Sequence, residues 1–239
     1  MSSSFFNPLG PAHFSSLQSE LDAPGPPSKR VAVFFATREG HTQRIAERIA
    51  ADLLFLGFDV DLLPVRQRVP FPLSNYTAAV LAASVHAGSH EKEMVRFVKS
   101  YRAELERMTT AFLSVTLSEA GAEMTDKTPA EHAQFALDVD RMLRKFFNET
   151  GWLPTLSKPV AGALLYTRYN FLVRPMMKRI AKKAGAATDT SRDYDYTDWI
   201  GLDKFVDEFA VEICGKPAEE TPTGAALQFS SSGKRDCHA

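Results

Sequence analysis

Cysteine, long apolar runs and net charge are all scarce in this sequence, and each scarcity excludes a class of protein. The two cysteines, Cys214 and Cys237, both lie near the C-terminus. They argue against a disulfide framework or a cysteine-ligated metal site, and they suit a reducing compartment. No stretch reaches the ~18 consecutive apolar residues that a membrane-spanning helix needs, and the start lacks the basic and apolar regions of a secretory signal. We therefore expect a soluble, cytoplasmic protein.

The formal net charge is -1 over 239 residues, so no overall field favours nucleic acid as a partner. The histidines show no ligand spacing, and the acidic residues near 189–198 are typical of turns and helix caps, so we expect no metal site. A chain that is 44% hydrophobic and 24% charged can bury the core of an ordinary globular domain.

Serine, proline, glycine and polar residues dominate both ends. Residues 1–28 and 215–239 have no periodic apolar face, which predicts a disordered arm and a disordered tail. Between them we expect one domain over residues 29–214, with a basic insertion at about 167–196.

Apolar and amphipathic segments alternate along this domain. Five apolar segments predict strands, at 31–36, 58–65, 78–85, 110–117 and 159–166. Amphipathic segments predict helices, at 42–56, 90–108, 128–147 and 198–213, while 117–128 is expected to be a polar loop. The pattern predicts an α/β fold, a doubly wound five-stranded parallel sheet with helices on both faces. Ligands of such sheets bind at the carboxyl ends of the strands, which here are the loops at 37–42, 84–90, 117–128 and 166–170.

The polar turn at 37–42 follows the first strand and opens the first helix. Free backbone N–H groups and the helix dipole make such a turn an anion site, and its threonine hydroxyls and arginine add donors. It lacks the spaced glycines of a dinucleotide site and the Gly-Lys-Ser/Thr of a nucleotidase loop, so a terminal phosphomonoester fits best. The alternative is a helix cap in which Thr42 satisfies only backbone groups.

Several stretches, taken in order, carry a resemblance to a known family. They are "FATREGHTQRIA" (35–46), "AASVHAG" (82–88), "AFLSVTL" (111–117), "KTPAEH" (127–132), "VAGALLYTRYNF" (160–171) and "ATDTSRDYDYTDW" (187–199). The chain resembles the flavodoxin-like, menaquinone-dependent protoporphyrinogen IX dehydrogenases of bacterial haem biosynthesis. The last two stretches distinguish this family from ordinary flavodoxins.

The resemblance implies an FMN cofactor and an oxidation carried out on the flavin, with protoporphyrinogen IX and a quinone as partners and no catalytic side chain. The phosphate would lie on Thr37, Arg38, Glu39, Gly40, His41 and Thr42. The Glu39 carboxylate would then have to point away from it. The ring would be flanked by two loops, made of Ser84, Val85, His86, Ala87 and Gly88 and of Thr116, Leu117 and Ser118. Ala87 stands where the family has a tyrosine.

A basic segment with interleaved apolar residues runs from Arg168 to Lys183 and contains no acidic residue. Such a segment can lie on an anionic membrane surface or bind the carboxylates of a substrate. The candidate residues for this surface are Arg168, Tyr169, Arg174, Lys178, Arg179 and Lys182. The alternative is a solvated basic face whose apolar side packs on the sheet.

Three other functions stay open at this point. A flavodoxin-type electron carrier would bind the flavin and have no substrate of its own. An NAD(P)H-dependent FMN quinone reductase could bind nicotinamide without any motif. A family member with another substrate would fit the departures at Ala87 and 118–126.

Overall fold

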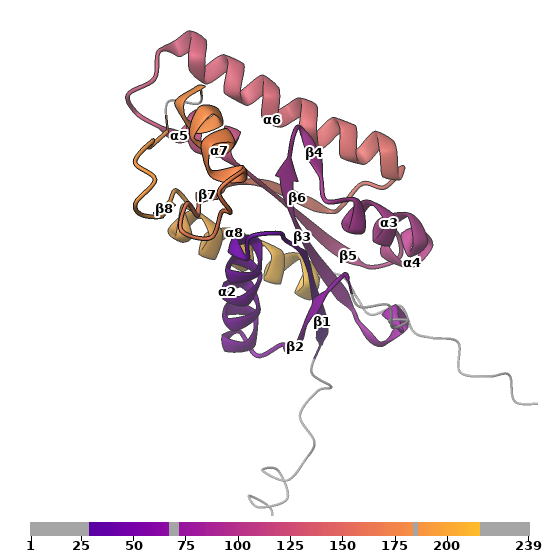
Figure 1. The fold of residues 1–239 in the computed structure, drawn as a ribbon. Helices are drawn as coiled ribbons and strands as arrows, with labels where there is room; N and C mark the ends of the chain where they lie inside the picture. Colours follow the sequence, from indigo (N-terminus) through magenta and orange to yellow (C-terminus); the bar gives the residue numbers. More distant parts are fainter. Residues whose placement is uncertain (1–28, 67–71, 184–185, 216–239) are drawn as a thin grey trace, which may run out of the picture.

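A computed structural model describes residues 29–66, 72–183 and 186–215 (Figure 1). The disorder predicted for residues 1–28 and 216–239 lies outside the described residues. Gly215, expected in the tail, is instead the last residue of a helix.

A parallel sheet forms the centre of the domain, and its strand order confirms the predicted fold class. Across the sheet the strands are β2 (Asp59–Pro64), β1 (Arg30–Ala36), β3 (Ala78–His86), β5 (Thr109–Thr116) and β6 (Leu156–Ala161). All four neighbouring pairs are parallel. This is the flavodoxin-like order, which reverses at β1 and β3 and so places a crevice at their carboxyl ends. Strand β5 is buried throughout and β3 is buried up to its last two residues, because helices cover both faces.

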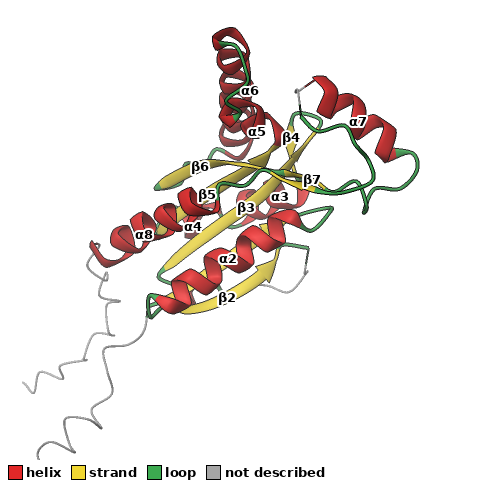
Figure 2. Ribbon diagram, turned by 90° about the vertical axis from the view of Figure 1, so that its left-hand side faces the viewer, coloured by secondary structure: helices red, strands yellow, loops and turns green. Residues whose placement is uncertain are grey.

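Each face of the sheet has its own hydrophobic cluster. Helices α2 (His41–Phe55) and α8 (Trp199–Gly215) pack on one face, and Figure 2 shows them in front of the sheet. Helices α3 (Lys92–Ser100), α4 (Arg102–Leu105) and α6 (Pro129–Thr150), with the short helix η1 (Leu73–Asn75), cover the other face. Helix α6 begins with the predicted capping box at Thr128 and Glu131. It continues past the predicted end to Thr150 and is followed by Gly151, which has a left-handed conformation.

Two predicted elements have different bounds. The helix expected at 90–108 is interrupted at Tyr101, which gives α3 and α4. The fifth strand starts earlier than predicted and ends at Ala161, because its partner β5 ends at Thr116. The chain then leaves the sheet as β7 (Ala163–Leu164), which pairs antiparallel with β8 (Tyr194–Asp195).

The predicted polar loop at 117–128 was wrong over its first half, which is helix α5 (Leu117–Glu123). Thr116 caps this helix by accepting a hydrogen bond from the Ser118 N–H. At Gly121 a Cβ would lie 2.8 Å from the ring of Phe135 on α6. A short helix with a central glycine has weak intrinsic propensity, so its packing on α6 is what stabilises it.

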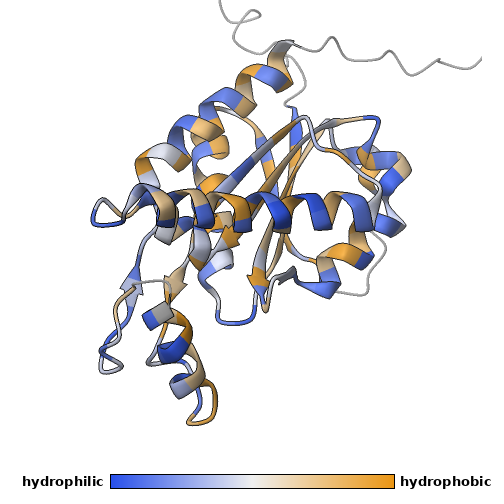
Figure 3. Cartoon of the chain, turned by 90° about the horizontal axis from the view of Figure 1, so that it is seen from above, coloured by the Kyte–Doolittle hydropathy of each residue, from blue (hydrophilic) through white to orange (hydrophobic). Residues whose placement is uncertain are grey.

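The segment from β7 to β8, which contains most of the basic insertion predicted at about 167–196, folds around a small core of its own. Strands β7 and β8 and helix α7 (Val173–Lys183) enclose the buried side chains of Leu164, Tyr166 and Tyr169. In Figures 2 and 3, α7 stands away from the sheet, near the end at which β3 terminates and pairs with β4 (Ser89–His90). Within the described ranges, no helix is long and apolar enough to cross a membrane.

Candidate functional site

The turn between β1 and α2 forms one wall of the crevice. Gly40 is left-handed, with φ of 93°, and its N–H donates to Thr37 Oγ1 at 3.0 Å. No side chain among the described residues caps α2. The first N–H groups of α2 have no intrahelical acceptor, so they and the positive end of the helix dipole are available to an anion. This disfavours the alternative in which Thr42 acts as a helix cap.

The basic insertion contacts this turn directly. Arg168 Nη1 donates to the carbonyl oxygen of Glu39 at 2.9 Å, and a Cβ on Gly40 would lie 2.8 Å from the same nitrogen. The positive φ favours glycine here, and a Cβ would displace the guanidinium from its contact with the turn. The contact brings a full positive charge against the turn.

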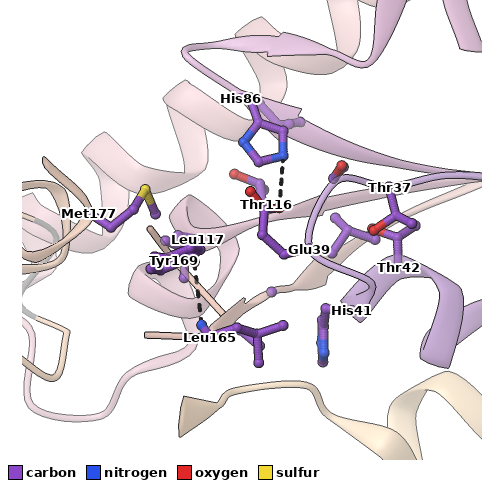
Figure 4. A pocket seen from close by; sticks show the side chains of 15 residues that line it. Thr37, Glu39, His41, Thr42, His86, Thr116, Leu117, Leu165, Tyr169 and Met177 are labelled. Carbon is purple, nitrogen blue, oxygen red and sulfur yellow. Dashed lines mark hydrogen bonds and ion pairs between the residues drawn. The ribbon is translucent and has the colours of Figure 1, made fainter. Parts of the chain in front are cut away.

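A cluster of charged side chains joins the turn to the loop after β3. The His86 Nε2 atom lies 3.3 Å from carboxylate oxygens of both Glu39 and Glu91. Glu91, whose side chain is 1% exposed, also pairs with Arg38 at 2.9 Å and accepts from Ser84 Oγ at 3.3 Å. Figure 4 shows Glu39 and His86 joined across the pocket. Burial alone would raise the pKa of Glu39, but the hydrogen bond and charge of His86, helped by Arg38, outweigh it and lower that pKa.

The loop after β3 is a tight hairpin. Val85 and His86 pair antiparallel with β4, and the turn between them consists of Ala87 and Gly88, with φ of 49° and 72°. Two positive φ angles are what a type I′ hairpin turn demands. Alanine tolerates this conformation at a cost of about 1 kcal/mol, so Ala87 is a strained residue at the edge of the crevice.

Two adjoining cavities lie between these elements. The smaller cavity, drawn in Figure 4, has a volume of about 70 Å³. The turn after β1, the ends of β3 and β5 and the segment after β7 all contribute to its lining. Its residues include Thr37, Glu39, Thr42, Ser84, His86, Thr116, Leu165 and Tyr169. The larger, of about 490 Å³, is lined by Ala87, Gly88, Ser118 and residues of α6 and α7. Val85, His86, Thr116, Leu117 and Met177 line both. The structure thus brings the predicted turn and both predicted ring loops to one crevice.

His41 sits beneath the turn with its ring buried. Its Nε2 atom lies 2.7 Å from Thr197 Oγ1, which in turn donates to the carbonyl of Ala161. Burial lowers the pKa of His41, and the charge of Asp195 offsets this only in part. The imidazole is therefore a neutral tie between α2 and the chain after β8, and its Nδ1 atom has no hydrogen-bond partner among the described residues.

The six candidate residues of the basic segment divide into two groups. Arg168 contacts the turn, the buried Tyr169 lines the smaller cavity, and Arg174 donates to the carbonyls of Tyr166 and Tyr169 at 3.1 and 3.3 Å. Burial raises the pKa of Tyr169 to about 12, so its hydroxyl stays protonated.

The remaining three, Lys178, Arg179 and Lys182, are exposed on α7. Apolar side chains of the same segment are exposed beside them, above all Phe171, at 82%, and Leu172, at 69%. Together, these three basic residues and the exposed Phe171 and Leu172 form a mixed basic and apolar surface.

Some residues of the site were not predicted from the sequence. Glu91, which pairs with Arg38 and His86, falls at the start of the helix predicted at 90–108, although its position shortly after a strand end was a usable signal. Asp138, Arg141 and Met142 on α6 and Met177 and Ile180 on α7 also line the larger cavity. Their proximity to the strand ends depends on how the two helices pack, which periodicity does not reveal.

A scan of protein families matches residues 32–191 to the flavodoxin domain model. The chain belongs to the flavodoxin family. Membership implies a flavin cofactor for the crevice described above.

Among curated proteins, the chain is 33% identical over 188 residues to "Protoporphyrinogen IX dehydrogenase [quinone]" of Escherichia coli K12, covering 79% of this chain and 98% of that protein. It is 32% identical to the protein of the same name from Leishmania major, over 77% of this chain and 75% of that one. The predicted family resemblance is confirmed. Among solved structures, oxidised flavodoxin 1 from Bacillus cereus aligns at 13% identity with a TM-score of 0.44, covering 77% of this chain and 98% of that one.

Proposed function

We propose that this protein is an FMN-dependent protoporphyrinogen IX dehydrogenase that passes electrons to a quinone. The observation that carries the proposal is the 33% identity along nearly the whole Escherichia coli protein of that name, and the geometry of the crevice supports it. Conversion of a porphyrinogen to a porphyrin removes six electrons with their protons, and each quinone takes up two of each. The oxidation therefore proceeds in two-electron steps.

The turn at 37–42 fits the phosphate of FMN. Its support comes from the uncapped N-terminus of α2, the left-handed Gly40 and the guanidinium of Arg168 at 2.9 Å from the Glu39 carbonyl. A dianion held there would meet backbone N–H groups and a cation. The Glu39 carboxylate is engaged by His86, which limits its repulsion of the phosphate.

The hairpin loop and the start of α5 fit the flavin ring. The backbone of Ala87 and Gly88 borders the larger cavity without a bulky side chain, and Leu117 offers an apolar contact from the opposite loop. Bound FMN would supply the redox chemistry by accepting a hydride equivalent and passing electrons on. The chain positions the partners, and we assign no side chain as an essential acid or base.

We further propose that the exposed surface of the insertion docks on the inner face of the cell membrane, with the rest of the domain in the cytoplasm. The support is the combination of Phe171 and Leu172, both largely exposed, with the exposed Lys178, Arg179 and Lys182. Apolar side chains can enter the headgroup region while the basic ones pair with anionic lipid. Such docking would bring the crevice to a lipid-soluble quinone.

The deciding experiment offers protoporphyrinogen IX and a menaquinone analogue to the purified full chain under nitrogen. We expect a flavin absorbance spectrum, porphyrin fluorescence that grows with time, and one quinone reduced for every two electrons removed. Flavin absorbance without porphyrin formation would be consistent with a flavin-binding protein but would overturn protoporphyrinogen IX as its substrate. That outcome is the one expected of a flavodoxin-type electron carrier. A chain that stays colourless after incubation with FMN would overturn the cofactor.

A further inference from the structure

The larger cavity opens between α6 and α7, beyond the loops assigned to the flavin ring. Its volume is about 490 Å³, within the range of small-molecule sites. The hairpin loop and residues 116–118 form its inner side, and it shares Val85, His86 and Met177 with the smaller cavity. Whatever occupies its outer half therefore lies next to the ring.

The outer walls of this cavity combine apolar side chains with the charged Asp138 and Arg141 of α6. Met142 comes from α6, and Met177 and Ile180 come from α7. Met142 is nearly buried, whereas Ile180 is 44% exposed. Methionine side chains are flexible and polarisable, and they adapt well to broad ring surfaces. Two facing helices with such walls can accept a flat, largely apolar molecule.

One cation stands at the rim. The Arg141 Nη1 atom lies 3.0 Å from Asp138 Oδ1, and the Arg141 side chain is 72% exposed. An exposed ion pair of this kind contributes little to stability, so the guanidinium is free to exchange its partner for a ligand carboxylate. Bidentate pairing with a carboxylate is the interaction that arginine makes best.

We propose that this groove binds the macrocycle of a dicarboxylic tetrapyrrole, with Arg141 pairing one of its propionates. The proposal rests on the proposed function and assigns the position of its substrate. The macrocycle lies against Met142, Met177 and Ile180, facing the side of the crevice that holds the flavin. A quinone has the flat ring but no carboxylate, so it would make no use of Arg141.

The test measures binding of protoporphyrin IX, which keeps both propionates, and of its dimethyl ester to the full chain saturated with FMN. Equilibrium dialysis with porphyrin absorbance gives both dissociation constants. Arg141→Gln should weaken binding of the diacid about tenfold and leave the ester unchanged, since a charge-assisted contact is lost. Arg144→Gln is the matched control, because Arg144 is an exposed arginine on the same helix with its own aspartate partner, Asp140. It should leave both constants unchanged.

A second pair of variants tests the apolar wall. Ile180→Glu should weaken binding of both the diacid and the ester, and Val211→Glu, a change of the same kind at an exposed position of α8, should weaken neither. The proposal would be overturned if Arg141→Gln bound both ligands with wild-type affinity. It would also be overturned if Arg141→Gln lost affinity equally for the diacid and the ester. It would also be overturned if Ile180→Glu raised the KM for the quinone and left porphyrin binding intact. These outcomes leave the proposed function standing, whereas failure of the wild-type chain to bind or form porphyrin overturns that function and the groove with it.

Discussion

The guanidinium of Arg168 and the carbonyl of Glu39 are joined by a 2.9 Å hydrogen bond across 129 positions of sequence. This bond ties the basic insertion to the turn at the N-terminus of α2. The insertion is therefore part of the cofactor crevice as well as an outer surface. Loading of the cofactor and ordering of the insertion are expected to favour each other, because both depend on the same contact.

Replacement of Arg168 tests that contact. We expect Arg168→Gln to raise the dissociation constant for FMN roughly tenfold, because hydrogen bonds to charged groups are worth about 1.5–3 kcal/mol. Riboflavin, which lacks the phosphate, should bind the variant as it binds the wild type. Flavin fluorescence quenching measures both, and Arg179→Gln in the same segment is the control. An equal loss for the two flavins would indicate a purely structural role.

Gly40 and Gly57 provide a matched pair of left-handed glycines. Their φ angles are 93° and 87°, but only at Gly40 would a Cβ meet another group, Arg168 Nη1 at 2.8 Å. Either alanine variant should lose about 1–2 kcal/mol of unfolding free energy through backbone strain, measured by urea denaturation. Only Gly40→Ala should also weaken FMN binding, by displacing Arg168. If Gly57→Ala weakened it as much, global destabilisation would be the cause.

Vesicle binding tests the outer face of the insertion. The full chain should sediment with vesicles that contain phosphatidylserine and much less with purely zwitterionic ones, and added salt should release it. The double variant Phe171→Ser/Leu172→Ser should lower the partition coefficient at least about tenfold, since each side chain can bury a large apolar area. Val211→Ser, at an exposed position of α8, should have no effect. Unchanged sedimentation of the double variant would contradict docking through this face.

His90 should make stability depend on pH. Its ring contacts those of Phe112 and Phe146, which stack on each other, and its Nε2 atom lies 2.8 Å from Ser114 Oγ. Burial, helped by the charge of Lys145, lowers its pKa from 6.5 to about 4. Between those values the unfolded chain takes up a proton and the folded chain does not. The free energy of unfolding should thus fall as pH drops from 6.5 to 4, by up to about 3 kcal/mol, and this contribution is constant above pH 6.5.

Denaturant titrations across that pH range check the effect of His90. The variant His90→Gln keeps a hydrogen-bonding group for Ser114 and does not titrate, so its stability should fall less steeply with acid. Parallel curves for the two proteins would show that His90 does not contribute to the slope.

The sequence predicted elements whose signal is local. The apolar run at 31–36 and the polar turn after it located β1 and the N-terminus of α2, and the capping box at Thr128 located the start of α6. Features whose signal is not local were missed or given the wrong bounds. Helix α5 depends on the packing of Gly121 on α6, and β6 ends where β5 can no longer pair with it. Neither depends on the propensity of its own residues.

For the site, the sequence by itself determined which residues stand at the carboxyl ends of the strands, because the alternation of apolar and amphipathic segments shows where each strand ends and predicts a parallel sheet. Only the tertiary structure decided what those residues contact. It placed Arg168 on the turn, buried Glu91 between Arg38 and His86, and set α7 opposite α6 to form a groove. The physical reason is that periodicity specifies which face of an element is buried, whereas contacts between distant segments depend on how those faces pack together.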